Sequence, residues 1–424
     1  MLEVAAVSRN VVSYICQVLH NNLWPQGLGR NPMLVALNVT TTLSFFASGS
    51  FQGSTEDLCS ISQSVNYGQQ INITRPIDGF SEKIFDTLDK KPETEYEHSV
   101  ICSVSGSQYI TTFDGTRYYF SGGCINTLVT TDLFTVSLGT NTCEEADNGN
   151  CIEYVTLTVK AIGISITLTK TGRAFLGKNE TELPFVYGSA TTLSVHLASS
   201  IFLEIMSMTG VHIQYDFKGG RIYMILQPNM VIETRGLCGT YNRNQLDDFM
   251  SSSNQIESVP MAFVNSWKGS TECADSPLFP VHKPCNVNHQ KESYATEKCS
   301  IIRSKIFKNC HFISPEPFYD QCRRDVCSCS DSETCLCTAL AHYAHVCLLH
   351  GAFIDFRVAI PECTMNCTGN MVYTLTNHAC KRNCYYLSTG SSCLKLPSSG
   401  HLEGCNCPEN MYFNPHIKNC VANM

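Results

Sequence analysis

The 424-residue sequence has no long hydrophobic run, no excess of basic residues and no recognisable leader. No stretch of about 18 uncharged apolar residues occurs, so we expect no membrane span. Lysine and arginine number 29 against 37 aspartates and glutamates, and this net charge of −8 without a basic patch disfavours a nucleic-acid partner. Residues 1–10 lack the basic and apolar regions of a secretory signal, which predicts a fragment or an alternative start.

Cysteine, by contrast, is abundant. Eighteen of the 25 cysteines fall between Cys273 and Cys420. So many cysteines are typical of an oxidising compartment, where they form disulfides. Four sequons fit the same compartment and predict N-glycosylation at Asn38, Asn72, Asn179 and Asn366. We therefore expect a secreted, extracellular protein.

Between residues 102 and 268 the apolar pattern indicates β-strands. Apolar residues alternate with polar or small ones at 155–159, 162–168 and 211–217, which predicts strands with one buried face. Residues 221–226 form a nearly continuous apolar run that could be buried on both faces. Many short strands joined by Gly, Asn and Thr turns predict an antiparallel β-sandwich, so the fold class is mainly β.

The pattern changes after Cys273. Residues 339–349 contain no glycine or proline and place apolar residues at helical spacing, which predicts a short amphipathic helix. Apolar residues within 302–307 suggest a second one. From Cys367 onward we expect no strands or helices, and so small a segment cannot bury enough apolar surface without cross-links. Disulfides, at roughly 2–4 kcal/mol each, would supply most of its stability.

Residues 236–249 form a loop rich in oxygen-bearing side chains, which follows a Gly-Leu-Cys-Gly turn. Asn242, Asn244, Asp247 and Asp248 offer carbonyl and carboxylate oxygens, the ligands that calcium prefers. The alternative is an Asx-rich turn whose side chains satisfy only its own backbone. On spacing alone the two interpretations stand side by side.

A second motif, Thr112-Phe113-Asp114-Gly115, lies upstream of this loop. Together with Cys102, residues 236–239 and residues 266–268 (Ser-Trp-Lys), it resembles the type D module of von Willebrand factor, gel-forming mucins and otogelins. The resemblance assigns residues 96–272 to such a module. It implies one calcium ion bound by Asp114 together with the loop, in which Asn242, Asp247 and Asp248 contribute side chains and Asn244 its carbonyl. Thr240 stands where the family usually has asparagine. The module would keep six cysteines: Cys102, Cys124, Cys143, Cys151, Cys238 and Cys273.

Two further modules follow by resemblance, and the fold of residues 1–95 is left open. Residues 285–363 resemble the eight-cysteine module of the same family, and residues 364–424 resemble a truncated trypsin-inhibitor-like module. Family cysteines are missing in pairs: Arg235 replaces one whose partner would lie near Leu133, and another pair is missing near Thr376 and residues 401–402. The last module keeps an odd number of cysteines, which leaves Cys384 without its family partner.

Two chemical alternatives compete with a structural role. His342 and His345 lie near Cys335, Cys337 and Cys347, which suggests zinc, but in an oxidising compartment the cysteines would be disulfides and the histidines helix-surface or packing residues. The third module could instead inhibit a protease. The preferred prediction is a non-enzymatic, calcium-stabilised and disulfide-bonded module set of a mucin-like or otogelin-like matrix glycoprotein. Its partners would be other matrix or mucin-like chains, with a homo-oligomer possible. No Ser/Thr/Pro-rich mucin tract is present.

Overall fold

The computed structural model describes residues 100–106, 109–120, 123–142, 150–188, 193–207, 209–226, 232–278, 284–376, 382–389 and 402–422. The chain divides into two compact units, Met1–Tyr96 and Glu97–Met424, and every described residue belongs to the second. The predictions for residues 1–95, including Asn38 and Asn72, and for Cys143 lie outside the described residues.

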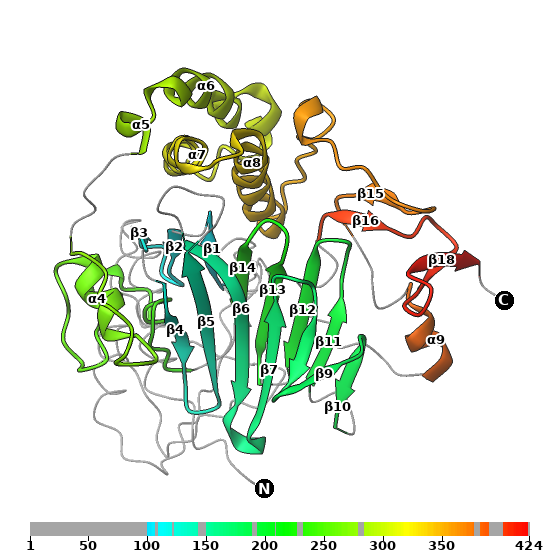
Figure 1. The fold of residues 1–424 in the computed structure, drawn as a ribbon, viewed down its shortest axis with the longest axis horizontal. Coiled ribbons are helices and arrows are strands. Elements are labelled where there is room, and N and C mark those ends of the chain that lie inside the picture. The colour runs from blue at the N-terminus through cyan, green and yellow to red at the C-terminus, as the bar shows by residue number, and fades with distance from the viewer. Residues whose placement is uncertain are drawn as a thin grey trace, which may run out of the picture. The chain divides into compact units, whose positions relative to one another are not determined.

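Two antiparallel sheets form a sandwich over residues 100–278 (Figure 1). One sheet has eight strands in the order β10-β11-β12-β13-β14-β1-β2-β3, and the other has six in the order β4 to β9. The eight-stranded sheet contains β1 (Val100–Ser105), β2 (Tyr109–Thr111), β3 (Arg117–Tyr119), β10 (Phe185–Tyr187), β11 (Leu193–Leu197), β12 (Phe202–Ser207), β13 (Val211–Asp216) and β14 (Arg221–Leu226). The six-stranded sheet contains β4 (Ile125–Thr130), β5 (Phe134–Thr142), β6 (Asn150–Val159), β7 (Ile164–Thr169), β8 (Ala174–Leu176) and β9 (Asn179–Thr181). Apolar side chains from both sheets share one core, which confirms the predicted sandwich.

The six-stranded sheet shows why alternation builds a one-sided strand. Leu157 of β6 lies between Val136 of β5 and Ile166 of β7, and all three are buried in the core. On the opposite face, the hydroxyls of Thr156 and Thr167 are 2.9 Å apart and hydrogen-bond across the strands. Ile162 departs from the prediction of a strand over 162–168, because it lies in a 3₁₀ turn and is 40% exposed.

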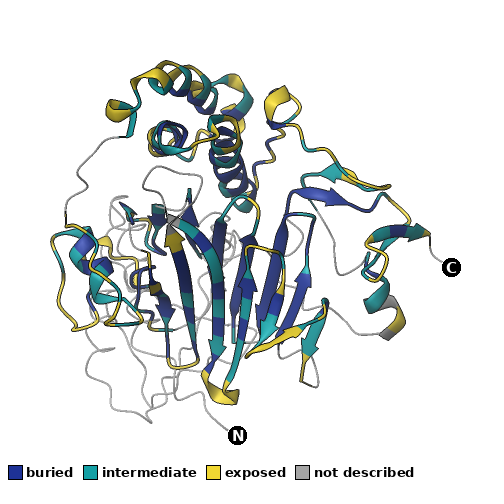
Figure 2. Cartoon of the chain, in the orientation of Figure 1, coloured by how far each residue is buried: buried dark blue, intermediate teal, exposed yellow. Residues whose placement is uncertain are grey.

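The central strands β12, β13 and β14 are buried at every position, as the dark blue strands of Figure 2 show. The prediction of burial on both faces is confirmed for residues 221–226. For β13 the prediction of a single buried face is wrong. His212, Gln214 and Asp216 point away from the sandwich core, yet other parts of the chain cover them.

The helical module, residues 284–363, packs α6, α7 and α8 together around a second core. Its helices are α5 (Pro284–Val287), α6 (His289–Cys299), α7 (Glu316–Ser328) and α8 (Ser332–Leu349), and α4 (Pro260–Ser266) precedes them in the sandwich. The Asp331 carboxylate caps α8 by accepting the backbone N–H groups of Glu333 and Thr334. The predicted helix near 302–307 is instead a pair of short 3₁₀ segments, Ser300–Arg303 and Lys305–Cys310.

The C-terminal segment, residues 364–424, is less irregular than predicted. It forms two two-stranded antiparallel sheets, β15 (Val372–Thr374) with β16 (Gly404–Asn406) and β17 (Met411–Asn414) with β18 (Asn419–Ala422), besides the short helix α9 (Cys384–Thr389). The β15–β16 ladder ends where Thr374 lies opposite Gly404. Thr376 and Leu402, near which a pair of family cysteines is missing, lie just beyond this end of the ladder.

Disulfides run through all three parts of the described chain. They join Cys102–Cys238, Cys124–Cys273, Cys285–Cys327, Cys299–Cys322, Cys310–Cys347, Cys329–Cys335, Cys337–Cys363, Cys367–Cys405 and Cys407–Cys420. Cys151 is also disulfide-bonded, and Cys384 is free, as predicted. Over the described residues, no helix has the length and apolar character needed to cross a bilayer.

Candidate cation loop and module junction

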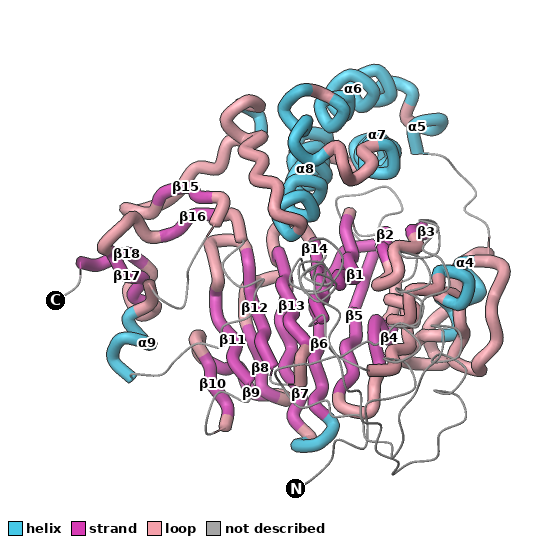
Figure 3. The backbone as a smooth tube through the Cα atoms, turned by 180° about the vertical axis from the view of Figure 1, so that it is seen from behind, coloured by secondary structure: helices cyan, strands magenta, loops and turns pink. Residues whose placement is uncertain are grey.

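The loop after Cys238 belongs to the long stretch between β14 and α4, drawn mainly as loop in Figure 3. Two glycines let it approach the sandwich closely. Gly236 has φ +122°, and a Cβ on it would lie 2.5 Å from the backbone oxygen of Leu128. Gly239 has φ +72°, and a Cβ there would lie 2.2 Å from Asp248 Oδ1. Only glycine fits both positions, and the Cys102–Cys238 disulfide fixes the turn to β1.

Asp114 organises the first half of this loop. It lies in the turn between β2 and β3, and its carboxylate accepts three backbone N–H groups from the loop. The donors are Asn242 at 3.2 Å, Arg243 at 3.0 Å and Asn244 at 3.2 Å. The Gln245 side chain also donates to the backbone oxygen of Asp114, at 2.7 Å. The sequence prediction that Asp114 meets the loop therefore agrees with the geometry.

Asp247 organises the second half. Its two carboxylate oxygens accept one hydrogen bond each, from the Thr240 hydroxyl and from the Asn242 amide, both at 2.7 Å. The Asn244 side chain caps the 3₁₀ turn Gln245–Asp247 by accepting the N–H of Leu246. Thr240, where the family has asparagine, thus gives its hydroxyl hydrogen to a carboxylate of the loop.

Asp248 differs from the other two carboxylates because it is fully buried. One oxygen, Oδ2, accepts the hydroxyl of Thr112 at 2.7 Å, whereas Oδ1 makes no hydrogen bond within the described residues. Burial raises the pKa of Asp248 above its ordinary value, and the negative charge of Asp114 raises it further. A buried carboxylate oxygen without a partner is unfavourable unless a cation or a proton occupies the space beside it.

The donor chemistry of this loop fits a calcium ion only if amide and backbone oxygens take part. Within the described ranges, no three His, Cys, Asp or Glu side chains converge closely enough to hold a metal by themselves. Calcium accepts about six to eight oxygen ligands from carboxylates, amides and carbonyls, and its coordination geometry is flexible. Asp114, Asp247, Asp248, Asn242 and the carbonyl of Asn244 would supply such a mixed set, and among the described residues Asp248 Oδ1 is a buried oxygen of this set that has no hydrogen-bond partner.

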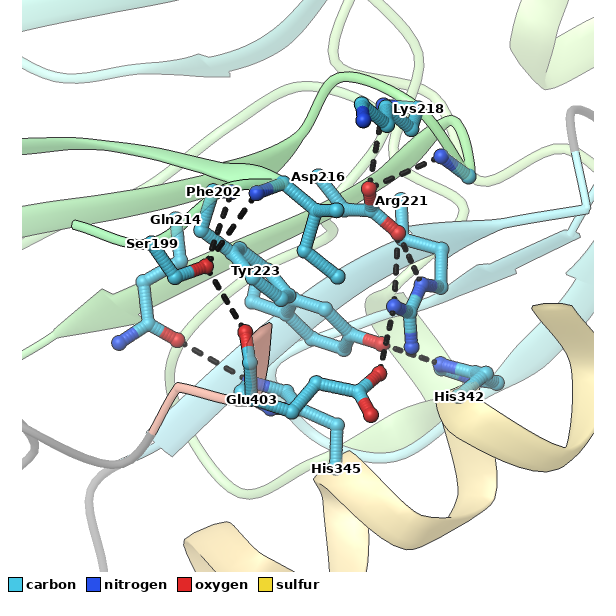
Figure 4. Close-up of polar contacts among 12 residues, drawn as sticks. Ser199, Phe202, Gln214, Asp216, Lys218, Arg221, Tyr223, His342, His345 and Glu403 are labelled. Carbon is cyan, nitrogen blue, oxygen red and sulfur yellow. Dashed lines mark hydrogen bonds and ion pairs between the residues drawn. The ribbon is translucent and has the colours of Figure 1, made fainter. Parts of the chain in front are cut away.

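A buried junction joins the sandwich to α8 (Figure 4). The hydroxyl of Tyr223 and Nδ1 of His342 are hydrogen-bonded at 2.9 Å, and Nε2 of His345 lies 3.0 Å from the side-chain oxygen of Gln214. The His345 ring also stacks on Phe202. Cys335, Cys337 and Cys347 are all in disulfides. The zinc alternative is therefore not supported, and the two histidines are packing residues rather than helix-surface residues.

An ion-pair network links the sandwich to both later parts of the chain, and Figure 4 shows its members Asp216, Arg221 and Glu403. Arg221 is 1% exposed, and its guanidinium donates to Asp216 at 2.7 Å and to Glu403 at 3.1 Å. Arg357, from the helical module, donates to the other oxygen of Glu403 at 2.9 Å, and Tyr373 donates to it at 3.3 Å. Burial alone would raise the pKa of Glu403, but Arg357 and Arg221 hold it at about 2.

A second buried carboxylate is that of Glu204 in β12. Nε2 of His196 is 2.9 Å from its carboxylate, His212 contacts the other oxygen, and Gln214 donates to that oxygen at 3.3 Å. Burial acts to raise the pKa of Glu204, and the two histidines outweigh it and lower that pKa below its ordinary value. Our sequence reasoning missed these residues. No local signal marks them, because polar residues at alternate positions of β13 equally fit a face exposed to solvent.

Helix α7 covers a different edge of the sandwich. The Gln321 amide donates to the Ser105 hydroxyl at 2.7 Å, and the Arg117 guanidinium lies 3.9 Å from the centre of the Phe318 ring. The Asp325 carboxyl is 7% exposed and packs against Gly106, where a Cβ would lie 2.3 Å from its Oδ2. Burial raises the pKa of Asp325 well above its ordinary value.

Comparison with known proteins identifies these parts. Residues 102–255 match the von Willebrand factor type D domain, and residues 298–364 match the C8 domain. The chain belongs to the von Willebrand factor type D proteins of the mucin-like and otogelin-like kind. It is 36% identical to human otogelin-like protein over 77% of this chain and 14% of that protein. It is also 36% identical to human otogelin over 76% of this chain and 11% of otogelin.

Similarity extends to mucins and to von Willebrand factor. The chain is 32% identical to human mucin-5B over 74% of its own length and 6% of that mucin. It is 30% identical to bovine von Willebrand factor over 74% of its length and 33% of that protein. The chain therefore spans a small part of each of these relatives. From here on, residues 100–278 are called the type D module and residues 284–363 the C8 module.

Two of the predicted glycosylation sites lie within the described residues. Asn179 is at the start of β9, and Asn366 is near the start of the C-terminal segment. Both are exposed, as a glycan requires, and their glycosylation stays a prediction.

Proposed function

We propose that this chain is a calcium-stabilised, disulfide-bonded structural module set of a secreted matrix or mucin-like glycoprotein, and that it acts in protein–protein assembly without catalysis. The observation that carries the proposal is the buried junction in which the type D module, the C8 module and the C-terminal segment share hydrogen bonds and ion pairs through Arg221, Arg357 and Glu403. Such a junction holds the surfaces of three modules in one arrangement. A partner that contacts these surfaces then binds an arrangement that is already ordered, so less conformational entropy is lost on binding.

The names of the relatives support the same role. Otogelin, otogelin-like protein, mucin-5B and von Willebrand factor share the type D similarity, and the described disulfides fit an extracellular setting. We infer that the partners are other matrix or mucin-like chains, including further copies of this one. Sedimentation velocity over a range of concentrations, with calcium and with a chelator, tests this. We expect association that strengthens with concentration. A chain that stays monomeric throughout and binds no mucin-like partner would contradict the assembly role.

In this proposal calcium binds between the Asp114 turn and the loop after Cys238. A bound cation would neutralise repulsion between Asp114 and Asp248 and occupy the space beside Asp248 Oδ1, which has no other partner within the described residues. Asp247 and Asn242 would contribute their side-chain oxygens, and Asn244 its carbonyl. The ion would thereby join the β2–β3 turn to the loop.

Calcium should raise the melting temperature of the chain, because a ligand that binds only the folded state stabilises it by about 2.7 kcal/mol at a hundred times its Kd. In Asp248→Asn the gain from calcium should disappear. Without calcium the same variant should be at least as stable as the wild type, since it removes a buried carboxylate whose pKa is raised. Differential scanning calorimetry with calcium and with chelator measures both effects.

Asp132→Asn is the matched control, because Asp132 is an exposed aspartate of the same module and lies outside the loop. It should keep the full response to calcium. A calcium-induced shift that survives in Asp248→Asn would refute the ligand assignment. Thr240→Asn should tighten the site by adding an amide oxygen, and weaker binding in that variant would count against the same assignment.

A further inference from the structure

The sequon at Asn366 has an unusual middle residue. In Asn366-Cys367-Thr368, the cysteine forms a disulfide with Cys405, 38 residues further along the chain. The asparagine and threonine side chains are exposed, whereas Cys367 is partly buried. The two groups that define the sequon thus face solvent while the residue between them is cross-linked.

The folded structure fixes both neighbours of Asn366. Met365 packs against the cluster that contains Phe202 and Leu402. On the other side, Cys367 is bonded to Cys405, which is 5% exposed and donates its N–H to the Ser200 hydroxyl at 2.9 Å. Closing the disulfide therefore anchors the sequon to the type D module.

Glycosylation requires the opposite condition. The Asn366 Nδ2 atom forms a bond to C1 of a sugar carried on a lipid diphosphate, the bond from C1 to the diphosphate oxygen breaks, and Nδ2 loses a proton as the lipid diphosphate leaves. The transferring enzyme must enclose both the asparagine amide and the hydroxyl of Thr368. Residues 366–368 therefore need to enter an enzyme cleft, which is possible only while the backbone around Cys367 is free.

The disulfide forms by a separate reaction at the same three residues. Cys367 and Cys405 lose two protons and two electrons to an oxidised dithiol of the secretory compartment by thiol–disulfide exchange. Cys405 is synthesised 38 residues after Cys367, which takes about 2–8 s at roughly 5–20 residues per second. The nearby Cys363 differs from Cys367, because its partner Cys337 lies earlier in the chain and is already present when Cys363 is synthesised.

We propose that N-glycosylation of Asn366 competes with closure of the Cys367–Cys405 disulfide, so that the redox conditions during synthesis set the occupancy of this site. Chains oxidised first carry the disulfide and no glycan at Asn366. Chains modified first carry both, because the exposed Asn366 side chain can hold a glycan after folding. Asn179 differs, since its sequon contains Glu180 and no cysteine.

The test expresses the full chain behind a cleavable secretory leader in cultured cells and measures the occupied fraction at each sequon by mass spectrometry after enzymatic deglycosylation in ¹⁸O-water. Cys405→Ser leaves the sequon intact and removes the disulfide partner. We expect partial occupancy of Asn366 in the wild type and nearly full occupancy in Cys405→Ser. Brief treatment of cells with dithiothreitol during synthesis should raise the wild-type occupancy in the same direction. Asn179 should stay unchanged in both experiments.

Cys407→Ser controls for general misfolding, because it breaks the neighbouring Cys407–Cys420 disulfide of the same segment and leaves Cys367–Cys405 in place. Its Asn366 occupancy should equal that of the wild type. Equal rises in Cys405→Ser and Cys407→Ser would overturn the competition, as would full occupancy in the wild type. Occupancy that does not rise in Cys405→Ser or with dithiothreitol would overturn it as well.

Discussion

At the residue scale, the described chain contains two buried carboxyl groups whose pKa values are shifted in opposite directions. Glu403 is held ionised by two arginines, and its pKa is about 2. Asp325 packs against Gly106 instead, and burial raises its pKa well above the ordinary 3.8. The difference follows from the number of cationic partners, because an ionised carboxylate in a buried site needs an opposite charge to offset its lost hydration.

Asp325→Asn should therefore stabilise the chain near neutral pH. Because the folded-state pKa of Asp325 is raised, the unfolded chain releases this proton at lower pH, and stability falls as pH rises above about 3.8 towards the folded-state value. Asparagine cannot ionise, so the variant should not lose stability in this way and should melt at a higher temperature than the wild type at pH 7. Thermal unfolding at pH 4 and pH 7 measures the gain.

Asp320→Asn, an exposed aspartate on the same helix, is the control and should change the stability little. A lower melting temperature of Asp325→Asn than of the wild type at pH 7 would contradict this prediction, because it would show that the Asp325 carboxylate stabilises the folded chain.

At the scale of elements, the sequence predicts strands better than it predicts what covers them. The strands β6 and β7 follow from alternation because only one face of each is buried. In β13 the polar side chains His212 and Gln214 alternate in the same way, and a local pattern cannot reveal that they are buried too. Gln214 meets His345 across 131 residues of sequence. The loop residues 242–248, in contrast, are neighbours in sequence, so their clustering could be predicted.

Helix α8 should make the stability of the chain sensitive to acid. Burial lowers the pKa of His342 well below 6.5, and Arg117, Arg221 and His345 lower it further. Because the folded-state pKa is lowered, the unfolded chain takes up a proton first as pH falls, so folded stability should decline below about pH 6.5. His342→Gln should reduce the decline in melting temperature between pH 7 and pH 5. In His289→Gln, which replaces an exposed histidine of α6, the decline should match the wild type. An equal decline in both variants would exclude His342 as the cause.

At the scale of the whole molecule, Glu403 is the group on which three parts of the chain meet. Removing one partner of a buried ion pair typically costs about 3–5 kcal/mol, because the remaining charge is left without compensation. Glu403→Ala should leave Arg357 without its carboxylate partner and Arg221 with Asp216 alone, and should loosen residues 402–422 from the type D module. Limited proteolysis should then cleave this segment faster than in the wild type. The control is Glu409→Ala, an exposed glutamate of the same segment. Equal cleavage rates in the two variants would show that the ion pairs do not hold the segment.

The disulfides described above also determine which backbone cuts can release a fragment. Cys102–Cys238 and Cys124–Cys273 overlap, so the two ends of any single cut between residues 102 and 273 stay covalently joined. The overlapping bonds of the C8 module protect residues 285–363 in the same way. Among the described disulfides, none spans the bonds between residues 273 and 285 or between 363 and 367. A protease that cuts inside the type D or C8 module therefore changes its surface without separating it, whereas after a cut in either linker no disulfide of the described residues joins the two sides, and the contacts of the buried junction must hold them together.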